Sequence, residues 1–145
     1  MNKIPLRNSH HPLYNSFKAL YSVSFPIFGQ RTEAQQEYAF LSANYHLMAY
    51  EENAVFIGFI AYWEFDAYVY IEHCAIDRGL RGQGYGSRLL SGFIEECRKG
   101  FCLKSIRSSM RYRRPGWAFI KNADSMKIPF RMSTLPIAKD TRHIL

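Results

Sequence analysis

A glycine-rich turn between a strand pattern and a helix pattern constrains the fold of this chain more than any other feature. Residues 68–76 are rich in aromatic and β-branched types and predict a strand. The turn Arg81-Gly82-Gln83-Gly84-Tyr85-Gly86 follows, and apolar residues then recur at helical spacing to about residue 98. Glycines allow a positive φ and close approach of a ligand, and the first N–H groups of a helix lack intrahelical partners. With the helix dipole, these groups predict a site for phosphate or pyrophosphate.

Two other nucleotide-binding motifs are excluded by the sequence and context of this turn. A P-loop requires Gly-Lys followed by Ser or Thr, and the turn contains no lysine. A dinucleotide-binding fold requires the turn after the first strand of a βαβ unit, whereas here it follows an antiparallel pattern. A connection that binds nothing would need neither three alternating glycines nor the flanking Arg81 and Arg88.

The pattern up to residue 98 predicts a single α/β domain. In the helix expected over residues 32–43, Thr32 and Gln35 form a capping box, and we expect Tyr38 and Leu41 on the inner face. The expected fold class is α/β, with a mixed, mostly antiparallel sheet flanked by helices. The elements are a short strand, two helices, three antiparallel strands and a third helix, at about 4–6, 15–24, 32–43, 46–50, 55–65, 68–76 and 84–98.

Charge is distributed unevenly along the 145 residues, which carry a formal net charge of +7. Residues 1–98 hold 8 Lys and Arg against 10 Asp and Glu, whereas residues 99–145 hold 11 against 2. The basic excess therefore lies in the tail, which argues against nucleic acid as the partner of the domain. No apolar run approaches the roughly 20 residues of a membrane span, no signal pattern is present and the three cysteines form no CxxC pair, so we expect a cytoplasmic protein.

The segment from the strand to the helix resembles the GCN5-related N-acetyltransferase (GNAT) family. That family's acetyl-CoA motif, Gln/Arg-x-x-Gly-x-Gly/Ala, is matched at every fixed position by residues 81–86, and the order of elements also fits. The resemblance implies an enzyme that transfers acetyl from acetyl-CoA to a primary amine of a small molecule or peptide, and it is compatible with a homodimer. It implies that backbone groups of the strand hold the pantetheine arm and those of the turn hold the pyrophosphate, which assigns cofactor binding to Cys74, Ala75, Ile76, Arg81, Gly82, Gln83, Gly84, Tyr85, Gly86 and Ser87.

Glu72 is the candidate general base. Strand alternation places Tyr70, Glu72, Cys74 and Ile76 on one face, and an acidic residue on this strand is a common base position in the family that the chain resembles. Alternatively, Glu72 pairs with a surface arginine or lines the substrate groove without taking a proton. We expect His73 to point to the opposite face and to serve in packing.

The remaining histidines and the cysteines show no metal-ligand spacing, so we expect no metal. A group of aromatic residues either floors a substrate groove or packs on the sheet: Tyr62, Trp63, Tyr68 and Tyr70.

The tail departs from the family pattern after Arg98, where a further apolar strand should follow. If each codon begins one base earlier, residues 101–107 permit Val-Leu-Leu-Glu-Val-Asp-Pro, which has the pattern of that strand. Residues 117–127 then permit Leu-Gly-Phe-Tyr-Gln-Lys-Arg-Gly-Phe-Asn-Glu, which resembles the family's Phe-Tyr and Gly-Phe motifs, and a third window follows. We therefore hypothesise a frameshift near Lys99–Gly100, which would make 1–98 the family-like core of a single domain 1–145 and 99–145 an atypical basic tail.

This hypothesis has structural consequences. We expect residues from about 103 onward to be poorly ordered or loosely helical and to carry no catalytic residue. The strand at 68–76 would then be an edge strand, and the chain would be unstable and weak or inactive. The alternative to an enzyme is a non-catalytic module that binds acetyl-CoA or another anion and carries a basic tail.

Overall fold

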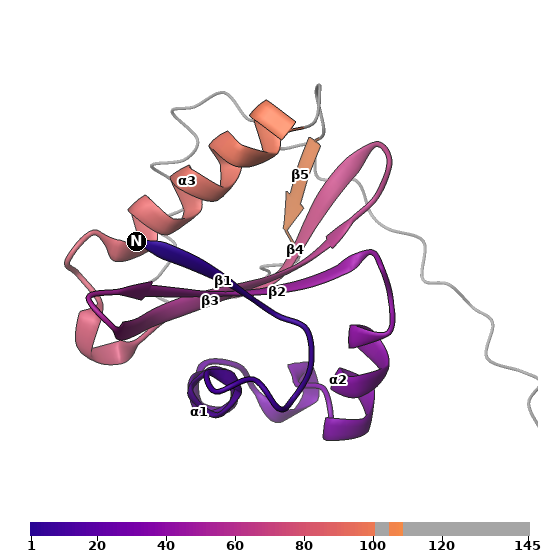
Figure 1. The fold of residues 1–145 in the computed structure, drawn as a ribbon, viewed down its shortest axis with the longest axis horizontal. Helices are drawn as coiled ribbons and strands as arrows, with labels where there is room; N and C mark the ends of the chain where they lie inside the picture. Colours follow the sequence, from indigo (N-terminus) through magenta and orange to yellow (C-terminus); the bar gives the residue numbers. More distant parts are fainter. Residues whose placement is uncertain (101–104, 109–145) are drawn as a thin grey trace, which may run out of the picture.

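A mixed five-stranded sheet organises the protein, as the computed structural model shows for residues 1–100 and 105–108 (Figure 1). Strands β1 to β4 are antiparallel neighbours, and β5 runs parallel to β4. The predicted α/β class with a mostly antiparallel sheet is thus confirmed. The elements are β1 (Asn2–Leu6), α1 (Tyr14–Ser24), η1 (Ile27–Gly29), α2 (Glu33–Phe40), β2 (Tyr45–Glu52), β3 (Val55–Glu64), β4 (Tyr68–Ile76), η2 (Arg78–Leu80), α3 (Tyr85–Gly100) and β5 (Ser105–Ser108).

The helices form a layer on each side of the sheet. Helices α1 and α2 lie against one face, and α3 covers the other (Figure 1). On the first face Phe17 of α1 meets Phe59 of β3 edge to face, with ring centroids 4.7 Å apart. On the second face Phe93 of α3 packs on Tyr62 of β3 at 4.8 Å. Burial of the aromatic side chains in these two cores stabilises the packing of β3 and β4 between the helix layers.

Helix α2 begins as predicted but packs by a different face. The Thr32 hydroxyl accepts from the backbone N–H of Gln35, and the Gln35 side chain accepts from the N–H of Thr32, which completes the capping box. Tyr38 and Leu41, expected on the inner face, are 78% and 82% exposed. The short helix instead buries Ala39 and Gln36, whose amide donates to the Tyr45 hydroxyl at 3.1 Å.

The structure corrects part of the expectation for the tail. Residues Ser105–Ser108 form β5, which pairs in parallel with Tyr68–Ile71 of β4. Backbone groups alone make this ladder, so the scattered apolar residues of the segment do not prevent it. The expectations for 101–104 and 109–145 lie outside the described residues.

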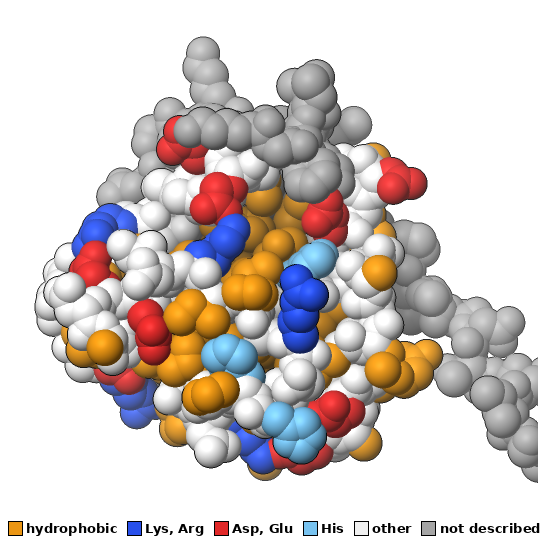
Figure 2. Space-filling view, in the orientation of Figure 1, with side chains coloured by type: hydrophobic (Ala, Val, Ile, Leu, Met, Phe, Trp, Pro, Cys, Tyr) orange, Lys and Arg blue, Asp and Glu red, His pale blue; other side chains and the backbone are white. Residues whose placement is uncertain are grey.

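Charged side chains of both signs are interspersed over the face shown in Figure 2, without a basic patch among the residues drawn in colour. Such a mixed surface agrees with the near balance of acidic and basic residues in the first 98 positions. Among the helices of residues 1–100, none is long and apolar enough to cross a bilayer.

Candidate active site

The glycine turn has the backbone geometry that its sequence predicts. Asp77 caps η2 by accepting from the N–H of Gly79 at 2.9 Å, and the chain then enters the turn. Gly82 and Gly84 have φ of 78° and 81°, which other residues rarely adopt. A Cβ atom at either glycine would meet nothing within 4 Å. The space in front of the turn is therefore open, and the amides that begin α3 lie beside it.

The two arginines near the turn are already engaged. Arg81 donates from Nε to the carbonyl oxygen of Ile76 at 3.2 Å and so ties the turn to the end of β4. Arg88 makes two hydrogen bonds to the Glu52 carboxylate, at 2.6 and 3.3 Å. These bonds hold the pKa of Glu52 below its ordinary value. The Glu52 carboxylate offsets the charge of Arg88, whereas Arg81 donates to a neutral carbonyl and keeps its charge, so an anion at the turn would rely mainly on backbone amides and Arg81.

Strand β4 offers backbone groups next to the turn. Cys74–Ile76 pair with Gly58–Ile60 of β3, whereas the described ladder to β5 ends at Ile71. Within residues 1–100 and 105–108, no strand pairs with the other edge of Cys74–Ile76. This edge can hydrogen-bond an extended ligand. Burial raises the pKa of the Cys74 thiol to about 12, so Cys74 is not a thiolate nucleophile.

A β-bulge changes which face each β4 side chain occupies. Ala61 of β3 pairs with His73 and the next residue, Tyr62, pairs with Ile71, so Glu72 is the extra residue of β4 in this register. The bulge reverses the alternation. Glu72 and His73 consequently lie on the α1–α2 side together, whereas Cys74 packs toward α3. The expected shared face of Glu72 with Cys74, and the opposite placement of His73, were therefore wrong.

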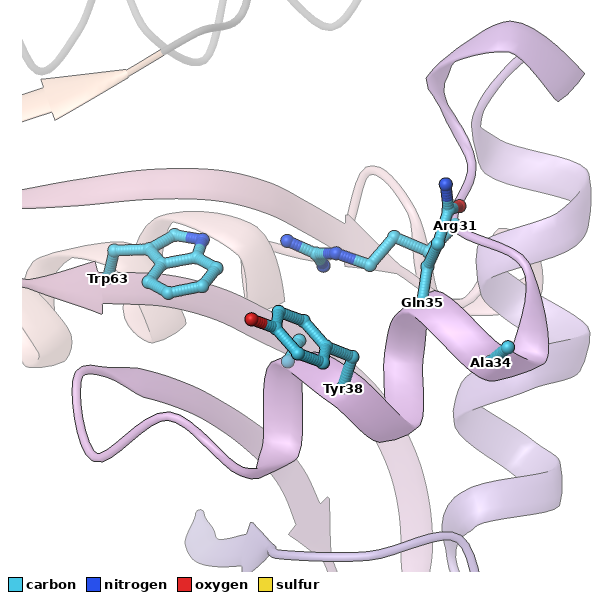
Figure 3. Close-up of a pocket in the computed structure, with 6 residues that line it drawn as sticks. Arg31, Ala34, Gln35, Tyr38 and Trp63 are labelled. Carbon is cyan, nitrogen blue, oxygen red and sulfur yellow. The ribbon is translucent and has the colours of Figure 1, made fainter. Parts of the chain in front are cut away.

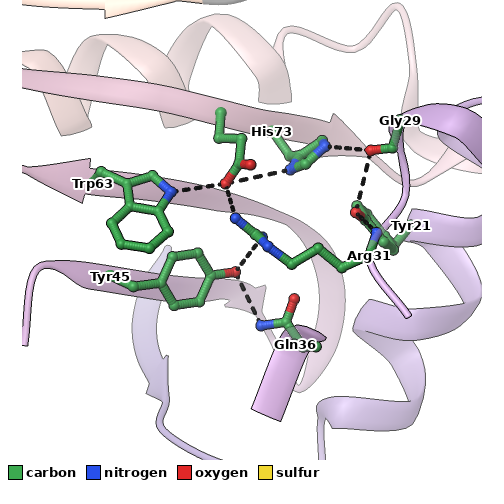
Figure 4. Close-up of polar contacts among 8 residues, drawn as sticks. Tyr21, Gly29, Arg31, Gln36, Tyr45, Trp63 and His73 are labelled. Atoms are coloured by element: carbon green, nitrogen blue, oxygen red, sulfur yellow. Dashed lines mark hydrogen bonds and ion pairs between the residues drawn. The ribbon is translucent and has the colours of Figure 1, made fainter. Parts of the chain in front are cut away.

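Glu72 lies in a network of polar contacts with Arg31, Trp63 and His73, the three partners that Figure 4 labels. Its Oε2 forms an ion pair with Arg31 and accepts from Trp63 Nε1 at 2.9 Å, with His73 Nδ1 at 4.0 Å. The side chains of Arg31 and Glu72 are 16% and 24% exposed, so the pair is accessible from one side. The alternative interpretation of Glu72, pairing with an arginine, expected this contact. That Glu72 acts as the general base remains a prediction.

His73 is buried beside this network. Its ring contacts Tyr21 and Phe25 edge to face, at 5.0 and 4.6 Å, as expected for a packing histidine. Nε2 donates to the carbonyl oxygen of Gly29 at 3.1 Å, which leaves the lone pair on Nδ1. Burial lowers the pKa of His73, partly offset by the carboxylate of Glu72. His73 is therefore neutral at pH 7.

A surface hollow of about 480 Å³ adjoins the Glu72 network (Figure 3). Trp63 and Arg31, which both contact Glu72, line it. The other lining residues come from α2: Ala34, Gln35, Tyr38 and Ala39. Of the aromatic residues proposed for a substrate groove, Trp63 lines this hollow, whereas Tyr62 packs in the α3 core.

Arg31 is the site residue that the sequence interpretation missed. It is a single basic residue before the N-cap of α2, and 41 positions separate it from Glu72. Its only local signal is a charge placed next to a capping box. Among the described residues, no group of three His, Cys, Asp or Glu could hold a metal ion.

Comparisons with known proteins agree with this geometry. The sequence profile of the acetyltransferase (GNAT) family matches residues 10–116. No curated protein matches the sequence. A solved GNAT-family protein from Bacteroides thetaiotaomicron is 25% identical, with a TM-score of 0.69 over 87% of this chain and 69% of its own.

Two further solved structures show the same fold at lower identity. The ribosomal-protein-S18-alanine N-acetyltransferase of Escherichia coli is 17% identical, with a TM-score of 0.66 over 87% of this chain and 76% of its own. An aminoglycoside acetyltransferase from an uncultured soil metagenomic sample is 14% identical, with a TM-score of 0.65 over 97% and 96%. The family match over more than half of the sequence and this shared fold show that the chain belongs to the GNAT family of acetyl-CoA-dependent N-acetyltransferases.

Proposed function

We propose that this protein transfers the acetyl group of acetyl-CoA to a primary amine, with Glu72 as the general base. The pyrophosphate would lie against the backbone of the turn from Gly82 to Ser87, beside Arg81. The pantetheine arm would extend along the open edge of Cys74–Ile76. The observation that supports this arrangement best is the bulge, because it turns the Glu72 carboxylate away from α3 and toward Arg31 and Trp63, which line the hollow.

The chemistry that follows is direct transfer. The amine nitrogen attacks the carbonyl carbon of the acetyl thioester, the carbon–sulfur bond breaks, and coenzyme A leaves as the thiolate. Glu72 accepts the proton that the amine loses. His73 Nδ1 lies 4.0 Å from Glu72 Oε2 and presents a lone pair toward it, so it can accept a hydrogen bond from the carboxyl group once Glu72 has taken the proton.

The acceptor would be a small molecule or a peptide with a primary amine. The solved relatives include enzymes named for aminoglycosides and for a ribosomal-protein alanine. At sequence identities of 14% and 17% to this chain, these enzymes share its fold but do not identify its acceptor.

The test is release of free thiol from acetyl-CoA in the presence of a panel of primary amines. In a chain whose C-terminal part is restored to the alternative reading frame, Glu72→Gln should lower the rate by about 10²–10⁴-fold and change acetyl-CoA affinity little. Glu37→Gln, which removes an exposed carboxylate from α2, is the matched control and should keep the parent rate. Equal rates for the parent and Glu72→Gln would remove Glu72 from the base role. Acetyl-CoA binding by the restored chain without thiol release for any amine would favour the non-catalytic module.

We also propose that the tail reflects a frameshift near Lys99–Gly100 and that this form of the chain is impaired. The support is the run of alternative-frame windows at 101–107 and 117–127. Resequencing the gene across codons 95–105 tests it directly. A reading frame that stays intact through these codons would overturn the proposal, and a higher turnover of the corrected chain would support the expected impairment.

A further inference from the structure

Arg31 occupies a site with the chemistry of a cation-binding pocket (Figure 4). Its guanidinium forms the ion pair with Glu72 and lies over the ring of Tyr45, 4.9 Å from the centroid. The ring of Trp63 is 5.8 Å from the same guanidinium carbon. A carboxylate beside two aromatic faces attracts cations both by charge and by the ring quadrupoles. The free protein fills this site with its own side chain.

The hollow continues from this cation site toward solvent, and its lining is largely apolar. Trp63, Tyr38, Ala34 and Ala39 supply the walls, and Gln35 supplies the polar group at the rim (Figure 3). Tyr38 is 78% exposed, so a bound molecule would cover its ring. A ligand that fits both parts carries a positive group at one end and an apolar or aromatic body at the other.

We infer that the acceptor is a primary amine with an apolar or aromatic body, and that its ammonium group displaces Arg31 from Glu72. This inference rests on the proposed function for the identity of Glu72 as the base. The displacement brings the amine to the carboxylate that takes its proton. Arg31 is then a specificity-determining residue that holds the site in the free protein.

The anchoring of Arg31 allows this exchange. Its backbone N–H donates to the Tyr21 hydroxyl at 2.9 Å, and the Gln30 side chain before it donates to the carbonyls of Ser22 and Phe25. These bonds fix the main chain independently of the guanidinium, which Glu72 and the Tyr45 hydroxyl, at 3.4 Å, hold in place. Because Arg31 also lines the hollow, its guanidinium can leave Glu72 without displacing α2.

The same contacts disfavour an acidic ligand. The charge of Arg31 is already neutralised by Glu72, and a ligand carboxylate at Arg31 would lie close to the Glu72 carboxylate. Like charges at this separation repel in a partly buried site. The geometry therefore selects an ammonium group over a carboxylate of the same shape.

Calorimetry without acetyl-CoA tests this inference with two probes of matched shape, phenethylamine and 3-phenylpropionate. The parent protein should bind phenethylamine and not 3-phenylpropionate. Arg31→Met keeps an apolar side chain of similar length but removes the competing cation, so the Kd for phenethylamine should fall about tenfold. Arg7→Met, an exposed control distant from the hollow in sequence, should leave the Kd unchanged. Glu72→Gln should weaken binding at least about tenfold.

Three results would overturn the inference. They are absence of phenethylamine binding to the parent, an unchanged or weaker affinity in Arg31→Met, and binding of 3-phenylpropionate that Arg31→Met abolishes. If Arg31→Met unfolds, Arg31→Lys replaces it in the test. This variant retains a competing cation, so it should bind phenethylamine no more than about twofold tighter than the parent. Because the calorimetry omits acetyl-CoA, its result is independent of the thiol-release assay: amine binding here, together with no thiol release by the chain with the restored frame, would contradict the proposed function and leave the cation site standing.

Discussion

Gly58 in β3 is the position where a single methyl group should most disturb the active-site strand. A Cβ atom there would lie 2.2 Å from the carbonyl oxygen of Ala75 and 3.1 Å from the Cα of Ile76, both in β4 backbone. Contacts under 3.0 Å are essentially never found, so β3 and β4 must separate by about 1 Å. Overpacking of this kind costs about 1–3 kcal/mol, and each ladder hydrogen bond weakened adds about 1 kcal/mol. With one ladder bond weakened, Gly58→Ala should lower the free energy of unfolding by about 2–4 kcal/mol, a large part of the roughly 5–15 kcal/mol of an ordinary domain.

The matched control is Gly92→Ala on the exposed side of α3. Its Cβ would meet nothing within 4 Å, and alanine in a helix interior is about 1 kcal/mol more favourable than glycine. Urea denaturation followed by circular dichroism should therefore show opposite signs for the same chemical change. A Gly58→Ala protein as stable as the parent would refute the close approach of β3 and β4 on which the geometry of Cys74–Ile76 depends.

Two further predictions concern stability. Thr32→Ala should lower the free energy of unfolding by about 1 kcal/mol, because the backbone N–H of Gln35 loses its capping acceptor, and urea denaturation measures it. Burial lowers the pKa of His73, so the unfolded chain binds a proton more readily below about pH 6.5. The free energy of unfolding should therefore fall between pH 7.5 and 5.5, by at most about 1.4 kcal/mol per pH unit for this group. His73→Gln should flatten that slope. Burial also lowers the pKa of His46, but its ring is more exposed, so His46→Gln should flatten the slope less. Equal slopes in the parent and in His73→Gln would contradict the explanation.

Local sequence signals predicted several elements of this fold well. The capping box at Thr32, the β4 strand and the glycine turn each depend on residues within a few positions, and each appears in the structure. The turn was predictable because positive φ strongly favours glycine, here Gly82 and Gly84. Contacts of this range can be read from residue types and spacing alone.

The errors arose where pairing between strands decides the outcome. Alternation along β4 could not reveal a bulge, because the extra residue is defined only by the register with β3. The buried face of α2 was misjudged because a polar residue, Gln36, is inside to satisfy the Tyr45 hydroxyl. The contact of Arg31 with Glu72 joins two segments that are far apart in the sequence, and no sequence pattern near either residue predicts it.

The central claim is that acetyl-CoA binds at the turn between β4 and α3. The most direct test is to measure the affinity of acetyl-CoA for three variants. Gly84→Asp places a carboxylate in the open space where the pyrophosphate would lie, and Gly84→Asn places an uncharged side chain of the same shape at the same φ of 81°. Gly92→Asp adds the same charge further along α3. In calorimetry we expect Gly84→Asp to weaken acetyl-CoA binding at least about tenfold, or about 1.4 kcal/mol, through charge repulsion. Gly84→Asn should lose less, and Gly92→Asp should match the parent. Parent affinity in Gly84→Asp, or no acetyl-CoA binding by the parent, would contradict the account.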